Sequence, residues 1–285
     1  NINLPHQDPV KREVFSNKDF RAGLSHAINR QEIIDVIWLG TGQPHQNAPL
    51  PGTKYYNEQL ATQFLEYDVD MANQYLDEAG LTERDGDGFR LMPNGERCTV
   101  IIESTTTQTD QQDALELIQN YWAEVGVDLQ IKVEERTIFY DRHAANVHDA
   151  SIWGSPGGRG FDVIITPKQF VPYHTGGSRF ALPWAYWYNN PDAEVAEEPP
   201  EEVKRQFELY RQVLTVASDE EREELMREVL QIAADQFYSM GLSSGIDGYR
   251  IVSNRMHNVP DMVGSWNYPT PGPSNPQQYW LEEEA

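Results

Sequence analysis

Cysteine is nearly absent from this sequence of 285 residues, in which Cys98 is the only one. A lone cysteine excludes an intramolecular disulfide and any cysteine-based metal cage. Cys98 stands directly before the β-branched run Thr99 to Ile102, where a small apolar side chain suits a buried strand. We therefore expect a buried thiol that is structural rather than reactive.

Long apolar runs and positive charge are also scarce. The stretch from Ile33 to Leu39 contains Asp35 and falls far short of the ~20 residues that cross a bilayer. With 45 acidic and 22 basic residues the formal charge is -23, which repels nucleic-acid backbones and anionic membrane surfaces. A membrane span is therefore excluded, and nucleic acid is not expected as a partner. The acidic clusters at 194–202 and 219–224 lie among helix formers and predict solvated helix faces.

The first third of the chain carries clear helix signals. Apolar side chains from Phe20 to Ile28 share one helical stripe, and Asn29 followed by Glu32 has the spacing of a capping box. Two short helices are therefore expected to meet at Asn29. Asp68 and Gly80 bracket a further helix as its N-cap and its left-handed terminator.

A strand–helix–strand unit is predicted next. The strand is expected over Thr99 to Glu103, and the helix runs from about Asp110 to Val125, where Gly126 stops it. Residues 127–133 then alternate apolar and polar side chains, as a half-buried strand does. A crossover of this length implies parallel pairing and a right-handed connection.

The second half of the chain is rich in aromatic residues and glycine. Residues from Pro199 to about Phe237 predict two helices, the second opened by Ser218, which pack as an antiparallel pair because almost no loop joins them. A strand is expected over Tyr249 to Val252, and the proline-rich tail from 268 to 279 is expected to run extended.

Several of these passages, in this order, resemble the family 5 extracellular solute-binding proteins, the receptors of peptide- and nickel-type ABC importers. The resemblance covers residue 19 to about residue 260. It is carried by FRAGLSHAINRQEII with GTGQP, DVDMANQYLDEAGL, the turns RDGDGFR and PNGE, YWAEVGV, and NVP at 258–260.

The resemblance implies an α/β fold, the C-terminal lobe of a type II periplasmic-binding-protein-like receptor, with a mixed sheet flanked by helices. Residues 1–15 are then a strand or linker leaving the N-terminal lobe, and 16–240 form the C-terminal solute-binding lobe. Residues 241–285 are the return segment towards the N-terminal lobe and the tail. Because the opposite lobe is not expected in this chain, we expect the chain alone to bind solute weakly.

The resemblance also implies a function. Two lobes close around a peptide-like solute, and the closed form is recognised by the membrane permease of an ABC importer. We expect a monomer that is extracytoplasmic, in the periplasm or on the cell surface as a lipoprotein whose N-terminal segment is missing here. An oligosaccharide-binding member of the same family is the alternative. No cofactor and no metal are expected.

Trp153 is the centre of the expected ligand site. It ends a short apolar run at a glycine-rich loop, and α/β sheets bind ligands where strands end. In the resembling receptors a tryptophan at the end of this strand lines the cleft. We expect the ligand-binding residues to be Trp153, Ser155, Arg159, Asp162, Tyr173, Trp184 and Trp187. Taken singly, the later aromatic residues fit a satellite core under a long loop better than a ligand contact.

The loop after Trp153 departs from the best-known receptors. In oligopeptide and dipeptide receptors an aspartate shortly after this tryptophan clamps the α-ammonium group of the peptide. Here Gly154 to Gly157 contain no acid, and Asp162 is the only carboxylate close by in sequence. Recognition of a free peptide N-terminus is therefore in doubt, whereas tryptophan and tyrosine platforms also suit stacking against sugar rings.

Enzymatic function rests on one motif. Gly241 to Gly245 fit the G-x-S-x-G pattern of a hydrolase elbow, which needs a strand before the serine and a helix after it. The predicted order here is the reverse, so the chain is not expected to be an enzyme. A serine hydrolase using Ser243 stays as the distant alternative, and an interaction module built on the acidic helix pair is a third class.

Two further motifs imitate metal sites. His143 and His148, with Asp141 and Asp149 nearby, lack the i, i+4 spacing of zinc ligands on helices and are expected to be solvated loop residues. The acids from Glu83 to Asp87 imitate half of a calcium loop, but no bidentate glutamate follows, so a β-turn is predicted.

Overall fold

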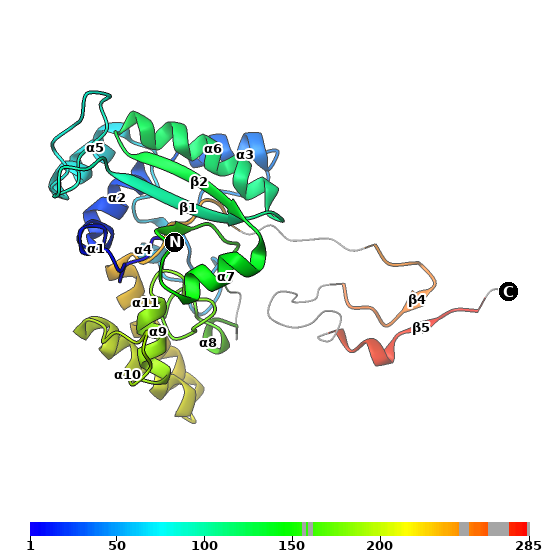
Figure 1. The fold of residues 1–285 in the computed structure, drawn as a ribbon. Coiled ribbons are helices and arrows are strands. Elements are labelled where there is room, and N and C mark those ends of the chain that lie inside the picture. Colours follow the sequence, from blue (N-terminus) through cyan, green and yellow to red (C-terminus); the bar gives the residue numbers. More distant parts are fainter. Residues whose placement is uncertain (156–157, 159–161, 245–250, 262–273, 284–285) are drawn as a thin grey trace. The chain divides into compact units, whose positions relative to one another are not determined.

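The computed structural model describes residues 1–155, 158, 162–244, 251–261 and 274–283 (Figure 1). The chain divides into two compact units, Asn1–Ser244 and Gly245–Ala285. Within the described residues no helix is long and apolar enough to cross a membrane. The helices of the first unit are α1 (Pro9–Ser16), α2 (Lys18–His26), α3 (Arg30–Ile37), α4 (Glu58–Thr62), α5 (Val69–Glu78), α6 (Thr109–Glu124), α7 (Arg136–Ala144), α8 (Asp162–Ile165), α9 (Leu182–Asn189), α10 (Glu201–Thr215) and α11 (Asp219–Gln236).

The predicted joint between α2 and α3 is confirmed. Asn29 is the N-cap of α3, and its side-chain oxygen accepts from the backbone N–H of Glu32 at 3.2 Å. Phe20 and Leu24 are fully buried on the inner face of α2. Asp68 caps α5 in the same way, because its carboxylate accepts from Met71 N at 2.8 Å.

Helix α1 corrects the expectation that residues 1–15 are a strand or linker. Pro9 occupies the first turn, where its missing N–H is not needed, and the Asp8 carboxylate accepts from Val10 N at 2.8 Å. Val14 and Phe15 are buried, so α1 packs as part of the core of the first unit. Only Ile2 pairs like a strand residue, through an antiparallel bridge to Ala150.

The main sheet has three strands, β1 (Thr99–Thr105), β2 (Asp128–Glu134) and β3 (Ala150–Ser151), in the order β2-β1-β3. Both pairings of the central strand β1 are parallel, with Ile102 opposite Ile131 on one side and opposite Ala150 on the other. The predicted strand–helix–strand unit is therefore confirmed. The three strands are all parallel, whereas a mixed sheet was expected, and Ile2 adds only an isolated antiparallel bridge to Ala150.

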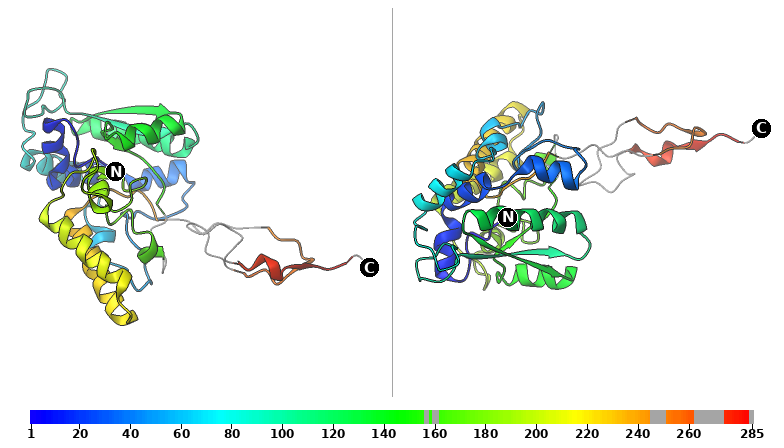
Figure 2. Two further views of the ribbon diagram at one scale, coloured as in Figure 1. Left: turned by 60° about the horizontal axis from the view of Figure 1, so that its bottom comes forward. Right: turned by 90° about the horizontal axis from the view of Figure 1, so that it is seen from above.

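Helices cover the sheet on two sides. Helix α6 leads from β1 to β2, whereas α7 leads from β2 back past β1 to β3. Because such crossovers are right-handed, opposite directions of travel put the two helices on opposite faces of the sheet. Figures 1 and 2 show this arrangement, with α6 and α7 on opposite sides of the strands. The carboxyl end of β1 is thus a topological switch point, the place where open α/β sheets bind ligands.

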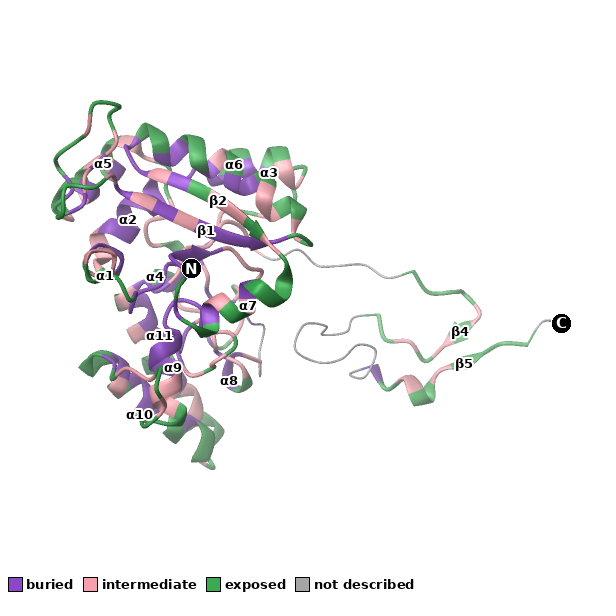
Figure 3. Ribbon diagram, in the orientation of Figure 1, coloured by how far each residue is buried: buried purple, intermediate pink, exposed green. Residues whose placement is uncertain are grey.

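Two hydrophobic clusters stabilise the first unit. The first cluster joins the sheet to α2, α3, α5 and α6, and it includes Trp122 and the free, buried Cys98, as predicted. The second cluster joins α4, α8 and α9 to the helix pair α10 and α11. Figure 3 shows buried residues following β1 and the inner faces of these helices. Burial raises the pKa of the Cys98 thiol to about 12, so it stays protonated.

The helix pair α10 and α11 is antiparallel, as predicted. Gln206 in α10 donates to the carbonyl of Val229 in α11 at 2.8 Å, so the two helices lie side by side after the short loop that joins them. Ser218 caps α11 by accepting from Glu221 N at 3.3 Å.

The turns before β1 are also as predicted. Gly88 N donates to Asp85 O at 3.1 Å in a β-turn, and the Asp85 carboxylate accepts from Arg97 Nε at 2.7 Å. These acids therefore have a structural role in the turn.

The second unit contains β4 (Met256–His257) and β5 (Trp280–Leu281), which pair antiparallel. The strand expected over Tyr249 to Val252 is wrong for its described residues, Ile251 and Val252. Neither belongs to a strand, and Ile251 is 93% exposed. Tyr249, Arg250 and residues 268–273 of the tail lie outside the described residues. Residues Pro276–Gln278 form a 3-10 turn instead of an extended segment.

Candidate functional site

Trp153 lies directly beyond the carboxyl end of β3, which stops at Ser151. Its indole is half-buried and contacts two rings from α7. The Phe139 ring stacks on it with centroids 5.4 Å apart, and the Tyr140 ring lies at 5.8 Å. The predicted tryptophan therefore occupies the edge of the sheet where the switch point is found.

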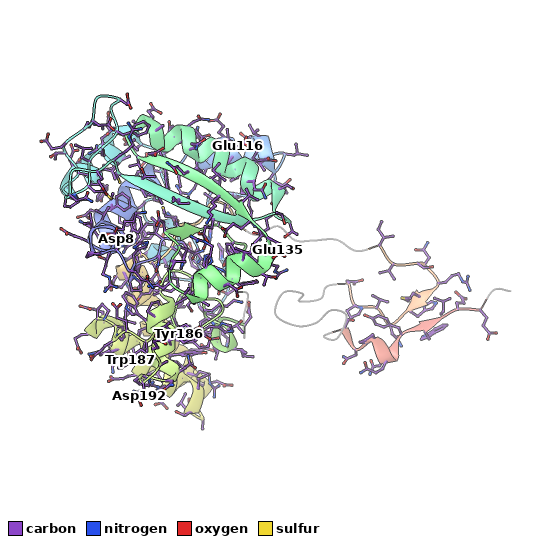
Figure 4. The ribbon with its side chains drawn as sticks, viewed as in Figure 1. Asp8, Glu116, Glu135, Tyr186, Trp187 and Asp192 are labelled. Carbon is purple, nitrogen blue, oxygen red and sulfur yellow. The ribbon has the colours of Figure 1, made fainter. Side chains whose placement is uncertain are left out.

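Helix α7 positions these rings. Glu135, labelled in Figure 4 at the start of α7, caps the helix by accepting from Thr137 N at 2.7 Å. Phe139 is fully buried, whereas Tyr140, the next residue, is half-buried. Arg136 lies one helical turn before Tyr140 and donates to its hydroxyl at 3.2 Å.

Two guanidinium groups complete the surroundings of Trp153. Arg179 Cζ lies 4.2 Å from the indole centroid, and Arg136 Cζ lies 5.6 Å from it. Both distances are within the range of cation–π contacts. Burial lowers the pKa of Arg179 to about 10, which leaves it charged at neutral pH. We call Arg136, Tyr140, Trp153 and Arg179 the arginine–tryptophan cluster.

The three later aromatic residues of the expected site lie elsewhere. Trp184 is 7% exposed and belongs to the second hydrophobic cluster. Tyr173 donates its hydroxyl to Ile165 O at 3.2 Å. Trp187, on α9 in Figure 4, stacks on Phe207 with centroids 6.3 Å apart. Their positions match the satellite-core interpretation, and the described ring and cation contacts of Trp153 come from α7 and Arg179.

The remaining expected residues surround the loop after Trp153. Ser155 is exposed and donates to the Asn47 side-chain oxygen at 2.7 Å. Asp162 opens the short helix α8, and its carbonyl accepts from Thr166 N at 2.9 Å. Arg159 lies outside the described residues.

The histidines correct the expectation of solvated loop residues. His143 lies on α7 and is 2% exposed, and His148 is fully buried. Their rings stack with centroids 3.8 Å apart, and His148 Nε2 lies 3.0 Å from Arg179 O. Burial lowers the pKa of His143 to about 2 and that of His148 to about 4, so both are neutral. Among the described residues no cluster of His, Cys, Asp and Glu is arranged to hold a metal ion.

Ser243 lies in a loop that packs against residues 42–47. It forms an isolated bridge with Pro44, and its hydroxyl donates to Ser244 O at 3.2 Å. A Cβ at Gly241 would come within 2.5 Å of His45 O, so this glycine serves close backbone packing. The preceding helix α11 ends at Gln236, which confirms the helix-first order. Gly245 lies outside the described residues.

Sequence reasoning missed Arg136, Tyr140 and Arg179. The spacing of Arg136 and Tyr140 on a helix that follows β2 was a usable signal, because that helix must return past β1. Arg179 carries no local signal, since tertiary packing alone brings it to Trp153.

A parallel sheet with helices on both faces, and an aromatic cluster at the carboxyl edge of its switch point, fits an α/β lobe of the periplasmic-binding-protein type. The family of bacterial extracellular solute-binding proteins, family 5 (middle part), matches residues 1–176. The chain therefore belongs to this family.

Known relatives agree with this assignment. The oligopeptide-binding protein AppA of Bacillus subtilis is 21% identical over 261 residues, which cover 87% of this chain and 44% of that protein. The solved structure of an oligopeptide-binding protein OppA matches with a TM-score of 0.78 at 30% identity. The match covers 99% of this chain and 46% of the OppA chain. A periplasmic binding protein of Agrobacterium fabrum, solved with stachyose, has the same fold, with a TM-score of 0.65 at 18% identity over 82% of this chain and 34% of that protein. The chain thus spans less than half the length of these relatives.

Proposed function

We propose that this chain is part of the substrate-binding component of an ABC importer. It binds a peptide-like solute at the carboxyl edge of its sheet, in a cleft closed by a second lobe, and delivers the solute to membrane permease subunits. The protein acts as an extracytoplasmic monomer, in the periplasm or anchored to the cell surface.

The position of the half-buried Trp153 at the switch point carries this proposal. Among the described residues Trp153 has no backbone hydrogen-bond partner, and a half-buried aromatic side chain of this kind offers a large apolar contact at low entropic cost. Family membership and relatives named for oligopeptide binding support a peptide as the solute. The packing role of Gly241 weighs against the serine hydrolase alternative.

A thermal-shift screen of the protein tests the proposal. Peptides, oligosaccharides and nickel complexes are compared, and a ligand present at 100 times its Kd should add about 2.7 kcal/mol to the free energy of unfolding. We expect stabilisation by peptides. Stabilisation by oligosaccharides alone would favour the alternative member of the family, and turnover of any ligand would contradict a binding protein.

A further inference from the structure

Basic side chains are in the minority here, at 22 against 45 acids, and many of them lie against carboxylates. Arg142, for example, donates to the buried Glu103 at 2.7 Å, and Arg97 pairs with Asp85. Other basic side chains, such as Arg21 and Arg30, donate to backbone carbonyls instead. Within the described residues, Arg136, Lys168 and Arg179 do neither. Within the described part of the chain, none of these three side chains forms an ion pair, although acids outnumber bases twofold.

The two arginines share the same two rings. Arg179 Cζ lies 4.2 Å from the Trp153 centroid and 5.7 Å from the Tyr140 centroid, and Arg136 Cζ lies 5.6 Å from each. Arg179 is only 6% exposed, and its Nε has no hydrogen-bond partner among the described residues. Two positively charged guanidinium groups therefore lie against the same aromatic faces. One of them, Arg179, is buried with its Nε–H donor unused among the described residues.

Lys168 adds a third positive charge. Burial lowers its pKa, and the nearby charge of Arg179 lowers it further. The stem of Lys168 packs against Gly177, where an added Cβ would come within 2.6 Å of Lys168 Cδ. The segment from 168 to 179 thus holds a lysine within electrostatic reach of the buried Arg179 and of Tyr140.

Holding cations together at a partly buried site costs free energy unless an anion joins them. A guanidinium group presents paired N–H donors that match the two oxygens of a carboxylate. We propose that the arginine–tryptophan cluster, with Lys168, is an anion subsite that binds a carboxylate group of the solute. This inference rests on the proposed function, and it predicts that the solute presents an acidic end to Trp153. The carboxylate is either the C-terminus of a peptide or an Asp or Glu side chain.

The test is a competition among peptides. The protein is mixed with random tetra- and pentapeptides, half of them C-terminally amidated, and the retained peptides are identified by mass spectrometry. We expect peptides that carry a carboxylate to be retained about tenfold over the same peptides without one. Loss of the preference on amidation identifies the C-terminus, and dependence on Asp or Glu identifies the side chain.

Variants connect this preference to the site. Arg136→Gln and Lys168→Gln change side chains that are not fully buried and should remove the preference, whereas Arg205→Gln, on the exposed face of α10, makes the same charge change and should keep it. An unchanged preference in Arg136→Gln and Lys168→Gln would overturn the anion subsite, as would equal retention of neutral peptides.

A second measurement separates failure of this inference from failure of the proposed function. The melting temperature is recorded in sodium glutarate and in sodium chloride of equal ionic strength. Glutarate should stabilise the unchanged protein and Arg205→Gln more than it stabilises Arg136→Gln. If no peptide binds but this difference appears, the anion subsite stands and the peptide receptor fails. If the three proteins respond equally, the subsite is refuted whichever peptides bind.

Discussion

His143 and His148 illustrate how burial decides the chemistry of single side chains in this protein. Their rings stack at 3.8 Å inside the first unit, and burial lowers the pKa of His143 to about 2 and of His148 to about 4. The sequence shows only two histidines near two aspartates without zinc-ligand spacing, a pattern that was interpreted as solvated loop residues. Burial is a property of the fold, which explains why sequence reasoning placed these residues wrongly.

A pH dependence of stability follows from the buried histidines. The folded pKa values lie below the ordinary value of 6.5, so the unfolded chain binds protons that the folded chain does not. The contribution of the two neutral histidines to the free energy of unfolding is therefore fully present above about pH 6.5. It falls as the pH drops toward 4, by about 1.4 kcal/mol per pH unit for each histidine. Urea unfolding at a series of pH values measures this slope. His143→Gln should reduce the slope, and an equal slope in both proteins would contradict a neutral His143.

Ser243 gives a prediction of no effect. Its hydroxyl donates to the neighbouring Ser244 carbonyl, and the flanking glycine serves packing against residues 45–47. Ser243→Ala should leave solute affinity and any background esterase activity unchanged, as measured by a binding titration and a nitrophenyl-ester assay. Stoichiometric labelling of Ser243 by a fluorophosphonate would instead establish a nucleophile.

The secondary-structure elements that could be predicted are those with local signals. The caps at Asn29 and Ser218 and the periodic apolar face of α6 can be recognised from residues close together in sequence, and the structure has helices there. Helix α1 was missed although Asp8 and Pro9 form a helix start, because the two prolines near the N-terminus were interpreted as a linker. Helix α7, which supplies much of the candidate site, has a weak apolar face and depends on tertiary packing.

The cap of α3 can be tested directly. Asn29→Ala removes the side-chain acceptor of the Glu32 N–H and should lower the free energy of unfolding by about 1 kcal/mol. Asn29→Ser keeps an oxygen at this position and should cost much less. Chemical denaturation measures both variants, and equal losses would show that the cap does not stabilise the joint between α2 and α3.

For the whole chain, the fold class and family were predictable, but the composition of the site was not. Several passages in the right order identified the lobe, and Trp153 was placed at the correct edge of the sheet. Arg136 and Arg179 come from segments far apart in sequence and meet only because both pack against Trp153 in the folded chain. A chain of net charge -23 therefore contains a local positive cluster that its composition does not reveal.

This positive cluster affects the expected ligand chemistry. No acid follows Trp153 directly, and two guanidinium groups lie beside it, so a peptide's α-ammonium group finds no counter-ion there. N-acetylation of a bound peptide should hardly change its affinity, and Asp162→Asn should be similarly mild. Isothermal titration of acetylated and free peptides measures the difference. A loss of two orders of magnitude on acetylation, about 2.8 kcal/mol, would restore α-ammonium recognition.

The affinity of Trp153→Ala for the solute found in the screen tests the central claim most directly. Trp187→Ala is the matched control, because Trp187 is also half-buried but stacks on Phe207 in the second hydrophobic cluster. We predict that Trp153→Ala weakens binding by roughly 1 to 3 kcal/mol while circular dichroism shows an intact fold, as expected for an aromatic anchor, and that Trp187→Ala keeps the affinity. Unchanged affinity in Trp153→Ala, with a lowered melting temperature, would contradict a solute site at the carboxyl edge of the sheet.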